Sequence, residues 1–220
     1  MQQNIITDMA EDLPFKVGNI PASGVSSAPS RIAQELAAWQ GKIETDPSML
    51  PRLTAYWSHL NYSPWSTNTA WSAAWVSWVL RGEGFPGASA HRDYTQAIVQ
   101  GEIPEWKAYS IAKNLDKIRL EPGDVLVRSR GSSAPTDKSG EYYKSHGAIV
   151  FRVTKTGLAE IVGGNSSDTV RVESRFQVDN KGRPTHGLGD YQIILKRTKK
   201  KWLQWMIPLF VLGAMWKKSQ

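Results

Sequence analysis

Three side chains of this sequence have the types and the order that acyl transfer from an amide requires. Ser72 lies in the stretch TNTAWSAAWVSWVLRGEGF, where we expect the first turn of a helix, whose dipole favours developing negative charge. His146 opens the apolar run HGAIVF, and Asn165 closes the next one, EIVGGN. A histidine can take the proton of a serine hydroxyl, and an amide can hold that imidazole in one tautomer. We therefore predict Ser72 as nucleophile, His146 as base and Asn165 as the orienting residue.

Some of the candidate residues also have a purely structural explanation. Ser72 can serve as a small side chain that lets its helix pack closely on a sheet. His91, in SAHRDY, is a candidate for substrate binding in the same cleft, but a surface or capping role is an equal alternative. Trp65, in the loop before the helix, is the tryptophan most suited to stack on a sugar ring. Helical spacing predicts core positions for the three that follow, Trp71, Trp75 and Trp78.

The periodicity of the chain predicts helices first and strands afterwards, which is an α+β fold with N-terminal helices packed on an antiparallel sheet. Apolar residues recur at helical spacing in the first half, where Ser30 is the expected first N-cap. The predicted helices cover 30–42, 48–60, 71–82, 89–101 and 104–115. Runs rich in β-branched residues, separated by Gly, Asp and Asn, follow after residue 117. The predicted strands lie within 120–130, 145–154, 158–165, 168–175 and 190–197.

Composition argues against several other classes of function. The 220 residues include no cysteine, which excludes disulfides, thiolate metal sites and a cysteine nucleophile. The four histidines lack the spacing of a zinc motif, so we expect neither a metal nor a cofactor. The net charge is +7, but seven of the 27 Lys and Arg residues lie in 196–220, a segment that contains no Asp or Glu. The remaining 20 basic residues match the 20 acidic ones, so no nucleic-acid partner is expected.

These patterns divide the chain into a flexible arm at 1–29, a domain at 30–195 and a basic tail at 196–220. The arm is small and polar, and it lacks the pattern of a secretory signal peptide. Within the tail, residues 202–216 are uncharged, with Trp near both ends and lysines on both sides. This pattern favours an apolar helix that anchors the protein in a lipid membrane, although as a helix it would span only about 22 Å. The alternative is an apolar helix docked on the domain or on a partner.

The motifs PGDVLV, HGAIVF and GGN follow one another as they do in the NlpC-type cell-wall peptidases and the CHAP amidases, which have a papain-like fold. With RIAQELAAWQ, WSAAWVSWVLR and SAHRDY added, residues 30 to 195 more closely resemble the bacterial DUF2272 domain, a relative of that fold. In the hydrolase families, a helix carries a cysteine nucleophile, a histidine heads a strand, and a third residue is polar. By this resemblance, Ser72 holds the cysteine position, His146 the histidine position and Asn165 the third position.

The resemblance implies a membrane-anchored hydrolase that cleaves an amide bond in the peptide part of peptidoglycan, or in a related peptide. This sequence departs from the hydrolase families in having a serine at the position of the cysteine. A serine needs full general-base help, whereas a thiol is already partly ionised near neutral pH. The alternative is a catalytically silent binding or structural protein that keeps the cleft. The tail anchor also suggests a setting, a virus particle with an internal membrane, which would carry the protein to the wall without secretion. The alternative setting is an ordinary tail-anchored bacterial protein that faces the cytoplasm, which would argue against a wall substrate.

Overall fold

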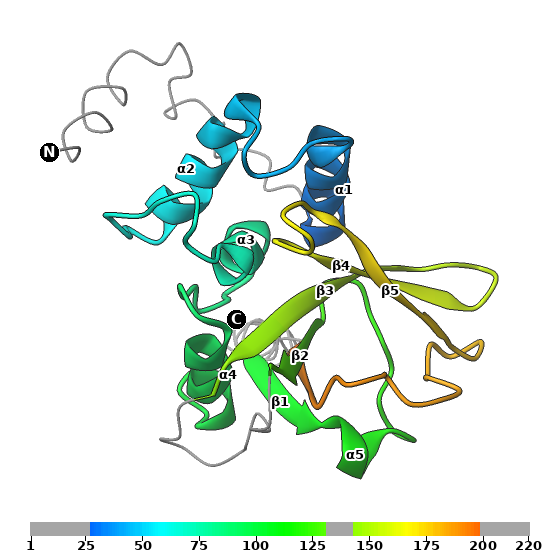
Figure 1. Ribbon diagram of the computed structural model, residues 1–220. Coiled ribbons are helices and arrows are strands. Elements are labelled where there is room, and N and C mark those ends of the chain that lie inside the picture. Colours follow the sequence, from blue (N-terminus) through cyan, green and yellow to red (C-terminus); the bar gives the residue numbers. More distant parts are fainter. Residues whose placement is uncertain (1–26, 131–142, 199–220) are drawn as a thin grey trace, which may run out of the picture.

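The computed structural model describes residues 27–130 and 143–198, in which helices accompany a six-stranded antiparallel sheet (Figure 1). This arrangement confirms the predicted combination of N-terminal helices with an antiparallel sheet. The predicted C-terminal helix at 202–216 lies outside the described residues. Within the described residues, no helix is long and apolar enough to cross a membrane. The helices are α1 (Ala28–Trp39), the 3₁₀ turn η2 (Pro47–Met49), α2 (Leu50–His59), α3 (Ser72–Val79), α4 (His91–Val99) and α5 (Ile111–Asn114).

The sheet has the strand order β1-β6-β2-β3-β4-β5, so β2, β3, β4 and β5 form a meander to which β6 and β1 are added at one side. All neighbouring strands pair antiparallel. The five strands predicted from β-branched runs are all present. The strands are β1 (Trp106–Ser110), β2 (Val125–Ser129), β3 (Ser145–Val153), β4 (Leu158–Gly163), β5 (Arg171–Gln177) and β6 (Ile193–Arg197).

Both faces of the central strands are buried, which explains why they consist of nearly continuous apolar runs. Successive side chains of a strand point to opposite faces. In β2, Val125 and Val127 join the core beneath the helices, whereas Leu126 joins a second core on the other face. Strand β6 alternates in the same way about Ile194.

Helices α1 to α4 cover one face of the sheet along β3, with α4 where that strand begins and α1 toward its end (Figure 1). Helices α1, α3 and α4 all pack on β3, and α2 packs on α3 (Figure 1). Tryptophans fill this layer: Trp39 and Trp71 stack with their ring centroids 4.8 Å apart, and Trp75 is fully buried. The layer therefore fixes where α3 begins relative to the first residues of β3.

Two sequence predictions about elements differ from the structure. The stretch 104–115, predicted as a helix, contains β1 followed by the single-turn α5. Pairing with β6 satisfies the backbone of Trp106–Ser110, and this tertiary pairing outweighs a weak helical pattern. Helix α1 begins at Ala28 rather than after Ser30, with extended Ser27 before it and a proline in its first turn. The predicted domain boundaries at 29/30 and 195/196 thus fall inside α1 and β6.

Gly164, just after β4, is a glycine because α3 lies directly against the backbone there. A Cβ atom at this position would lie 2.6–2.7 Å from three atoms of Trp75. Trp75 has no exposed surface and cannot move aside easily.

We predict that Gly164→Ala lowers the free energy of unfolding by about 1–3 kcal/mol, as overpacking of a close-packed core does. Chemical denaturation would measure the change. Gly187→Ala is the matched control, because a Cβ there meets nothing within 4 Å and should alter stability by less than about 0.5 kcal/mol. Equal stabilities of the two variants would contradict this account of the helix–sheet contact.

Candidate active site

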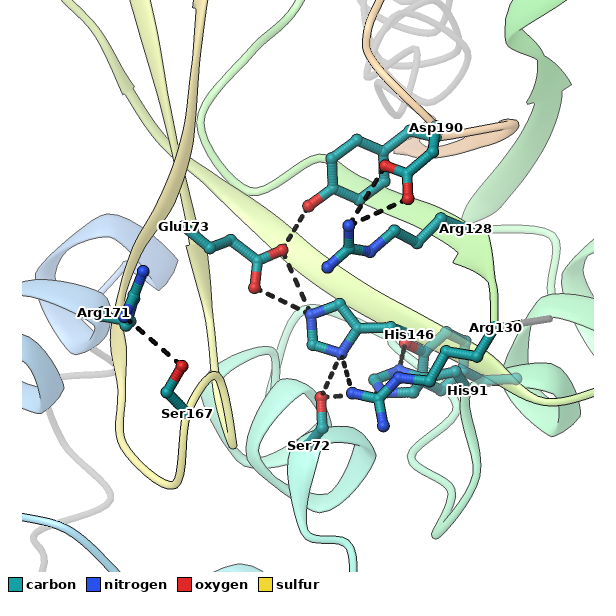
Figure 2. A network of polar contacts seen from close by, with 11 residues as sticks. Ser72, His91, Arg128, Arg130, His146, Ser167, Arg171, Glu173 and Asp190 are labelled. Carbon is teal, nitrogen blue, oxygen red and sulfur yellow. Dashed lines mark hydrogen bonds and ion pairs between the residues drawn. The ribbon is translucent and has the colours of Figure 1, made fainter.

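Ser72 is the first residue of α3, as predicted, and its hydroxyl faces the sheet. The residue is 5% exposed. Its Oγ lies 3.2 Å from Nδ1 of His146, the second residue of β3 (Figure 2). Backbone N–H groups in the first turn of a helix have no partner within that helix. Ser72 therefore combines a basic partner with a local environment that stabilises negative charge.

His146 is held on its other side by a carboxylate. Its Nε2 lies 2.9 Å from Oε2 and 3.2 Å from Oε1 of Glu173 (Figure 2). The two side chains are 1% and 5% exposed, so water hardly competes for this contact. An ionised carboxylate only accepts hydrogen bonds, so Nε2 must carry a hydrogen. In neutral His146 the nitrogen that faces Ser72, Nδ1, is then free to accept a proton.

Glu173 remains ionised although it is buried. Burial alone would raise the pKa of this carboxyl, but hydrogen bonds from His146 and Tyr191 and the positive charge of Arg128 lower its pKa below the ordinary value. Burial and the neighbouring carboxylate raise the pKa of the Tyr191 hydroxyl far above its usual range. Tyr191 therefore stays protonated and donates to Glu173.

A β-bulge brings Glu173 to this place. Val162 pairs with Val172 and Ile161 pairs with Ser174, which leaves Glu173 without a partner residue on β4. Such an extra residue locally re-aims a side chain. Sequence reasoning missed Glu173, because a bulge breaks the strict alternation by which strand residues are assigned to faces. The signal available was an acid in the middle of the predicted strand DTVRVESR.

The structure brings together three of the five predicted site residues directly, Ser72, His146 and His91. Asn165 was predicted to orient the imidazole, but the group that accepts the hydrogen bond from His146 Nε2–H is Glu173. Asn165 follows β4 in a left-handed conformation, with φ of 54°, and lines the pocket beside Ser72. Trp65 does not line that pocket; its ring packs against the core, 6.4 Å from the Trp57 ring.

His91, the first residue of α4, is the second imidazole at Ser72. Its Nε2 lies 2.9 Å from Ser72 Oγ, and its Nδ1 is hydrogen-bonded to the hydroxyl of Tyr94. The ring is buried, and its centroid lies 5.6 Å from that of His146. Burial, reinforced by the nearby His146 and Arg130, lowers the pKa of His91 well below its usual range. His91 is therefore a neutral ring.

Two glycines leave room for these contacts. A Cβ on Gly147, the residue after His146, would collide with Tyr94 and His91 at 2.4 and 2.6 Å. A Cβ on Gly163, at the end of β4, would lie 2.2 Å from Glu173 Oε2 and 3.3 Å from His146 Nε2. The glycines of the motifs HGAIVF and GGN are thus explained by side chains that converge from other elements.

A cavity of about 380 Å³ opens beside Ser72. We call it the Ser72 pocket. Its lining includes three basic residues and no acidic one among the described residues, and Arg130 reaches within 3.2 Å of His146 Nδ1. The described residues also hold no cluster of three His, Asp or Glu side chains suited to a metal ion. The Ser72 pocket is lined by Ala70, Ser72, Ala73, Ser89, Ala90, His91, Arg92, Arg130, Tyr143, Lys144, Ser145 and Asn165.

Comparison with known proteins identifies the family of the chain. The profile of DUF2272, described as an uncharacterized protein conserved in bacteria, matches residues 33–206. The chain belongs to the DUF2272 family. No curated protein and no solved structure gives a significant match. The DUF2272 match includes every element from α2 to β6, and with them all the residues of the candidate site.

We predict that Glu173→Gln destabilises this DUF2272 domain near neutral pH and loses that effect in acid. The folded-state pKa of Glu173 lies below its ordinary value of 4.5, so the ionised group contributes stability above that value. This contribution disappears as the pH falls through the folded-state pKa. Denaturant unfolding from about pH 7 to about pH 3 would show the gap between the two proteins narrowing below about pH 4.5. Glu102→Gln, at an exposed position, should show no such gap; a constant gap for Glu173→Gln would contradict the prediction.

Proposed function

We propose that this protein is a hydrolase that cleaves an amide bond by acyl transfer, with Ser72 as nucleophile and His146 as general base. The observation that carries the proposal is the contact of 3.2 Å between Ser72 Oγ and an imidazole whose opposite nitrogen is held by a buried carboxylate. A serine hydroxyl needs full general-base assistance, and this arrangement supplies it. Glu173 takes the orienting role that we had expected of Asn165.

The reaction follows from the positions of the protons. Ser72 Oγ attacks the carbonyl carbon of the scissile amide while its proton passes to His146 Nδ1, and the carbonyl π pair moves onto the substrate oxygen. Backbone N–H groups at the start of α3 stabilise that oxyanion. Collapse breaks the C–N bond, and the leaving amine takes the proton from Nδ1. Water, deprotonated by the same nitrogen, then hydrolyses the ester on Ser72.

The order of these parts supports a papain-like relationship to the NlpC-type peptidases and the CHAP amidases. The nucleophile begins a helix, the base begins a strand, and a polar residue of the same sheet orients it. Two departures distinguish this chain: a serine replaces the cysteine, and the orienting group is a glutamate two strands from β3. A carboxylate stabilises the imidazolium more strongly than an amide does, which suits a nucleophile with a higher pKa than a thiol.

The Ser72 pocket favours a substrate that carries negative charge. Arg92, Arg130 and Lys144 line it, and carboxylate groups are natural partners for such cations. The peptide part of peptidoglycan presents carboxylates next to amide bonds. We therefore retain the amide bonds of cell-wall peptides as the proposed target.

One contact favours a second candidate function, that of a catalytically silent protein that binds such peptides. The Arg130 guanidinium lies 3.2 Å from His146 Nδ1, the same distance as Ser72 Oγ. A donor at Nδ1 competes with Ser72 for the only lone pair of that nitrogen. If Arg130 holds this position when substrate is bound, the pocket binds peptides and leaves them intact.

We predict that the full chain clears a suspension of purified peptidoglycan and that Ser72→Ala and His146→Ala each reduce the rate at least about thousandfold. Turbidity, with analysis of the released amino groups, measures the reaction. Ser77→Ala is the matched control, because Ser77 is a buried serine of the same helix that bonds to Ala73 and Ala88 rather than to His146.

The variant Ser72→Cys separates the two candidate functions. Clearing by the parent chain that both alanine variants abolish supports the serine hydrolase. Activity of Ser72→Cys alone would mean that the serine silences an inherited mechanism. Peptide binding without clearing by any of these proteins would replace the hydrolase with the binding protein.

We also propose that residues 202–216, which lie outside the described residues, attach the protein to a lipid membrane, in the setting of a virus particle with an internal membrane. The uncharged run between lysine clusters supports the membrane attachment. The match to the family, however, continues to residue 206, into this run. That overlap keeps a helix docked on the domain as the alternative.

We predict that the full chain floats with anionic phospholipid vesicles in a density gradient, because an apolar run flanked by lysines inserts into such bilayers. Charges placed in the middle of the run, as in Leu209→Asp with Val211→Asp, should leave the protein at the bottom. As a control, Lys113→Asp with Lys117→Asp alters charge on the domain and should still float. Flotation of all three proteins would contradict the anchor.

A further inference from the structure

His91 is left without a task by the mechanism proposed above, although it touches the nucleophile more closely than the base does. Its Nε2 is 2.9 Å from Ser72 Oγ, compared with 3.2 Å for His146 Nδ1. His91 comes from α4 and His146 from β3, so two elements that are separate in the chain converge on one hydroxyl. Two buried imidazoles at one serine are more than packing requires.

The direction of every hydrogen bond in this chain of groups follows from the ionised Glu173. The carboxylate accepts from His146 Nε2–H, so in the neutral ring, the form in which His146 acts as a base, Nδ1 is the acceptor for the Ser72 hydroxyl. Ser72 Oγ has then used its only hydrogen, so it must accept from Nε2–H of His91. His91 is neutral, so its Nδ1 is bare and must accept from the Tyr94 hydroxyl.

The tyrosine at the far end fits this direction. Burial, reinforced by Tyr143, raises the pKa of Tyr94 well above its usual range, so this hydroxyl keeps its proton. The charged or titratable groups that face His91 are Tyr94 on its own helix, His146 on β3 and Arg130 after β2. None of them is an anion, so nothing among them favours a protonated His91.

We propose, resting on the serine hydrolase proposed above, that His91 is a positioning residue: its Nε2–H donates to Ser72 Oγ and turns the serine proton toward His146. The hydroxyl hydrogen of Ser72 then points to His146, one lone pair of Oγ accepts from His91, and the second lone pair remains for attack on the substrate. As the proton leaves, the bond from His91 becomes charge-assisted and therefore stronger. His91 thus stabilises the developing alkoxide without exchanging a proton itself.

The tautomer of His91 tests the proposal without any need for turnover. Long-range ¹H–¹⁵N NMR of the full chain, with ring signals assigned through His91→Gln and His146→Gln, reports which nitrogen carries hydrogen. We expect a protonated Nε2 and a bare Nδ1 that do not change between about pH 5 and about pH 8. A protonated Nδ1, or a ring that titrates in this range, would overturn the proposal.

The rate at which a fluorophosphonate modifies Ser72, followed by intact mass, tests the consequence for reactivity. We expect His91→Leu, which has no donor, to slow the modification about hundredfold. His91→Gln keeps an N–H group near the place of Nε2 and should restore most of the rate. Tyr94→Phe, which frees the tautomer, should give an intermediate rate. The control His186→Leu removes an exposed histidine and should react like the parent.

The outcomes separate this proposal from the one on which it rests. Equal rates of modification for the parent chain and for His91→Leu would overturn the role of His91 and keep the hydrolase, provided that circular dichroism shows the variant to be folded. A parent chain that never reacts, but shows the expected tautomer, would overturn the hydrolase and support His91 as the donor that holds Ser72.

Discussion

The hydrogen bond between His146 Nε2 and the buried carboxylate of Glu173 is the interaction on which the other contacts of the site depend. A carboxylate that stays ionised in the interior can only accept hydrogen bonds, so it determines which nitrogen of His146 carries hydrogen. That choice determines the role of Ser72, and through Ser72 the role of His91. A neutral group that can both donate and accept, in place of Glu173, would no longer require a hydrogen on Nε2 of His146.

A series of hydrogen bonds also joins the two cores of the domain. It runs from Tyr94 through His91, Ser72, His146 and Glu173 to Tyr191. Tyr94, at one end, belongs to the core between helices and sheet, and Tyr191, at the other end, belongs to the core on the opposite face. Side chains on opposite faces of a sheet normally do not meet. They meet here because β3 begins at Ser145, and Ser72 at the start of α3 lies beside that strand end. The packing that positions α3, including the contact of Trp75 with Gly164, therefore also positions Ser72.

In the proposed mechanism, a serine needs different surroundings from those of a cysteine nucleophile. A thiol is partly ionised near neutral pH, whereas a serine hydroxyl needs a base whose conjugate acid is stabilised. In that proposal the buried glutamate stabilises the imidazolium, and the neutral His91 beside the oxygen offers a donor without adding a competing charge. The basic lining of the Ser72 pocket adds positive charge beside these groups.

The sequence by itself determined the elements with strong local patterns, and it pointed to two residues of the candidate site, Ser72 and His146. Continuous β-branched runs predicted five strands because both faces of the sheet are buried. Ser72 was singled out because it begins the Trp-rich helix, and His146 because it opens the run HGAIVF. The strand at 106–110 was missed because its pairing with β6 is a contact across more than eighty residues, invisible in a local pattern.

Only the tertiary structure decided which groups surround the serine. Glu173 reaches His146 through a bulge of one residue, which moves a side chain that strict alternation would assign elsewhere. Asn165 lies at the pocket but leaves the imidazole to Glu173, and His91 arrives from a helix whose approach only the packed layer specifies. Local sequence patterns report periodicity along the chain, whereas hydrogen-bond partners depend on distances between elements that packing alone sets.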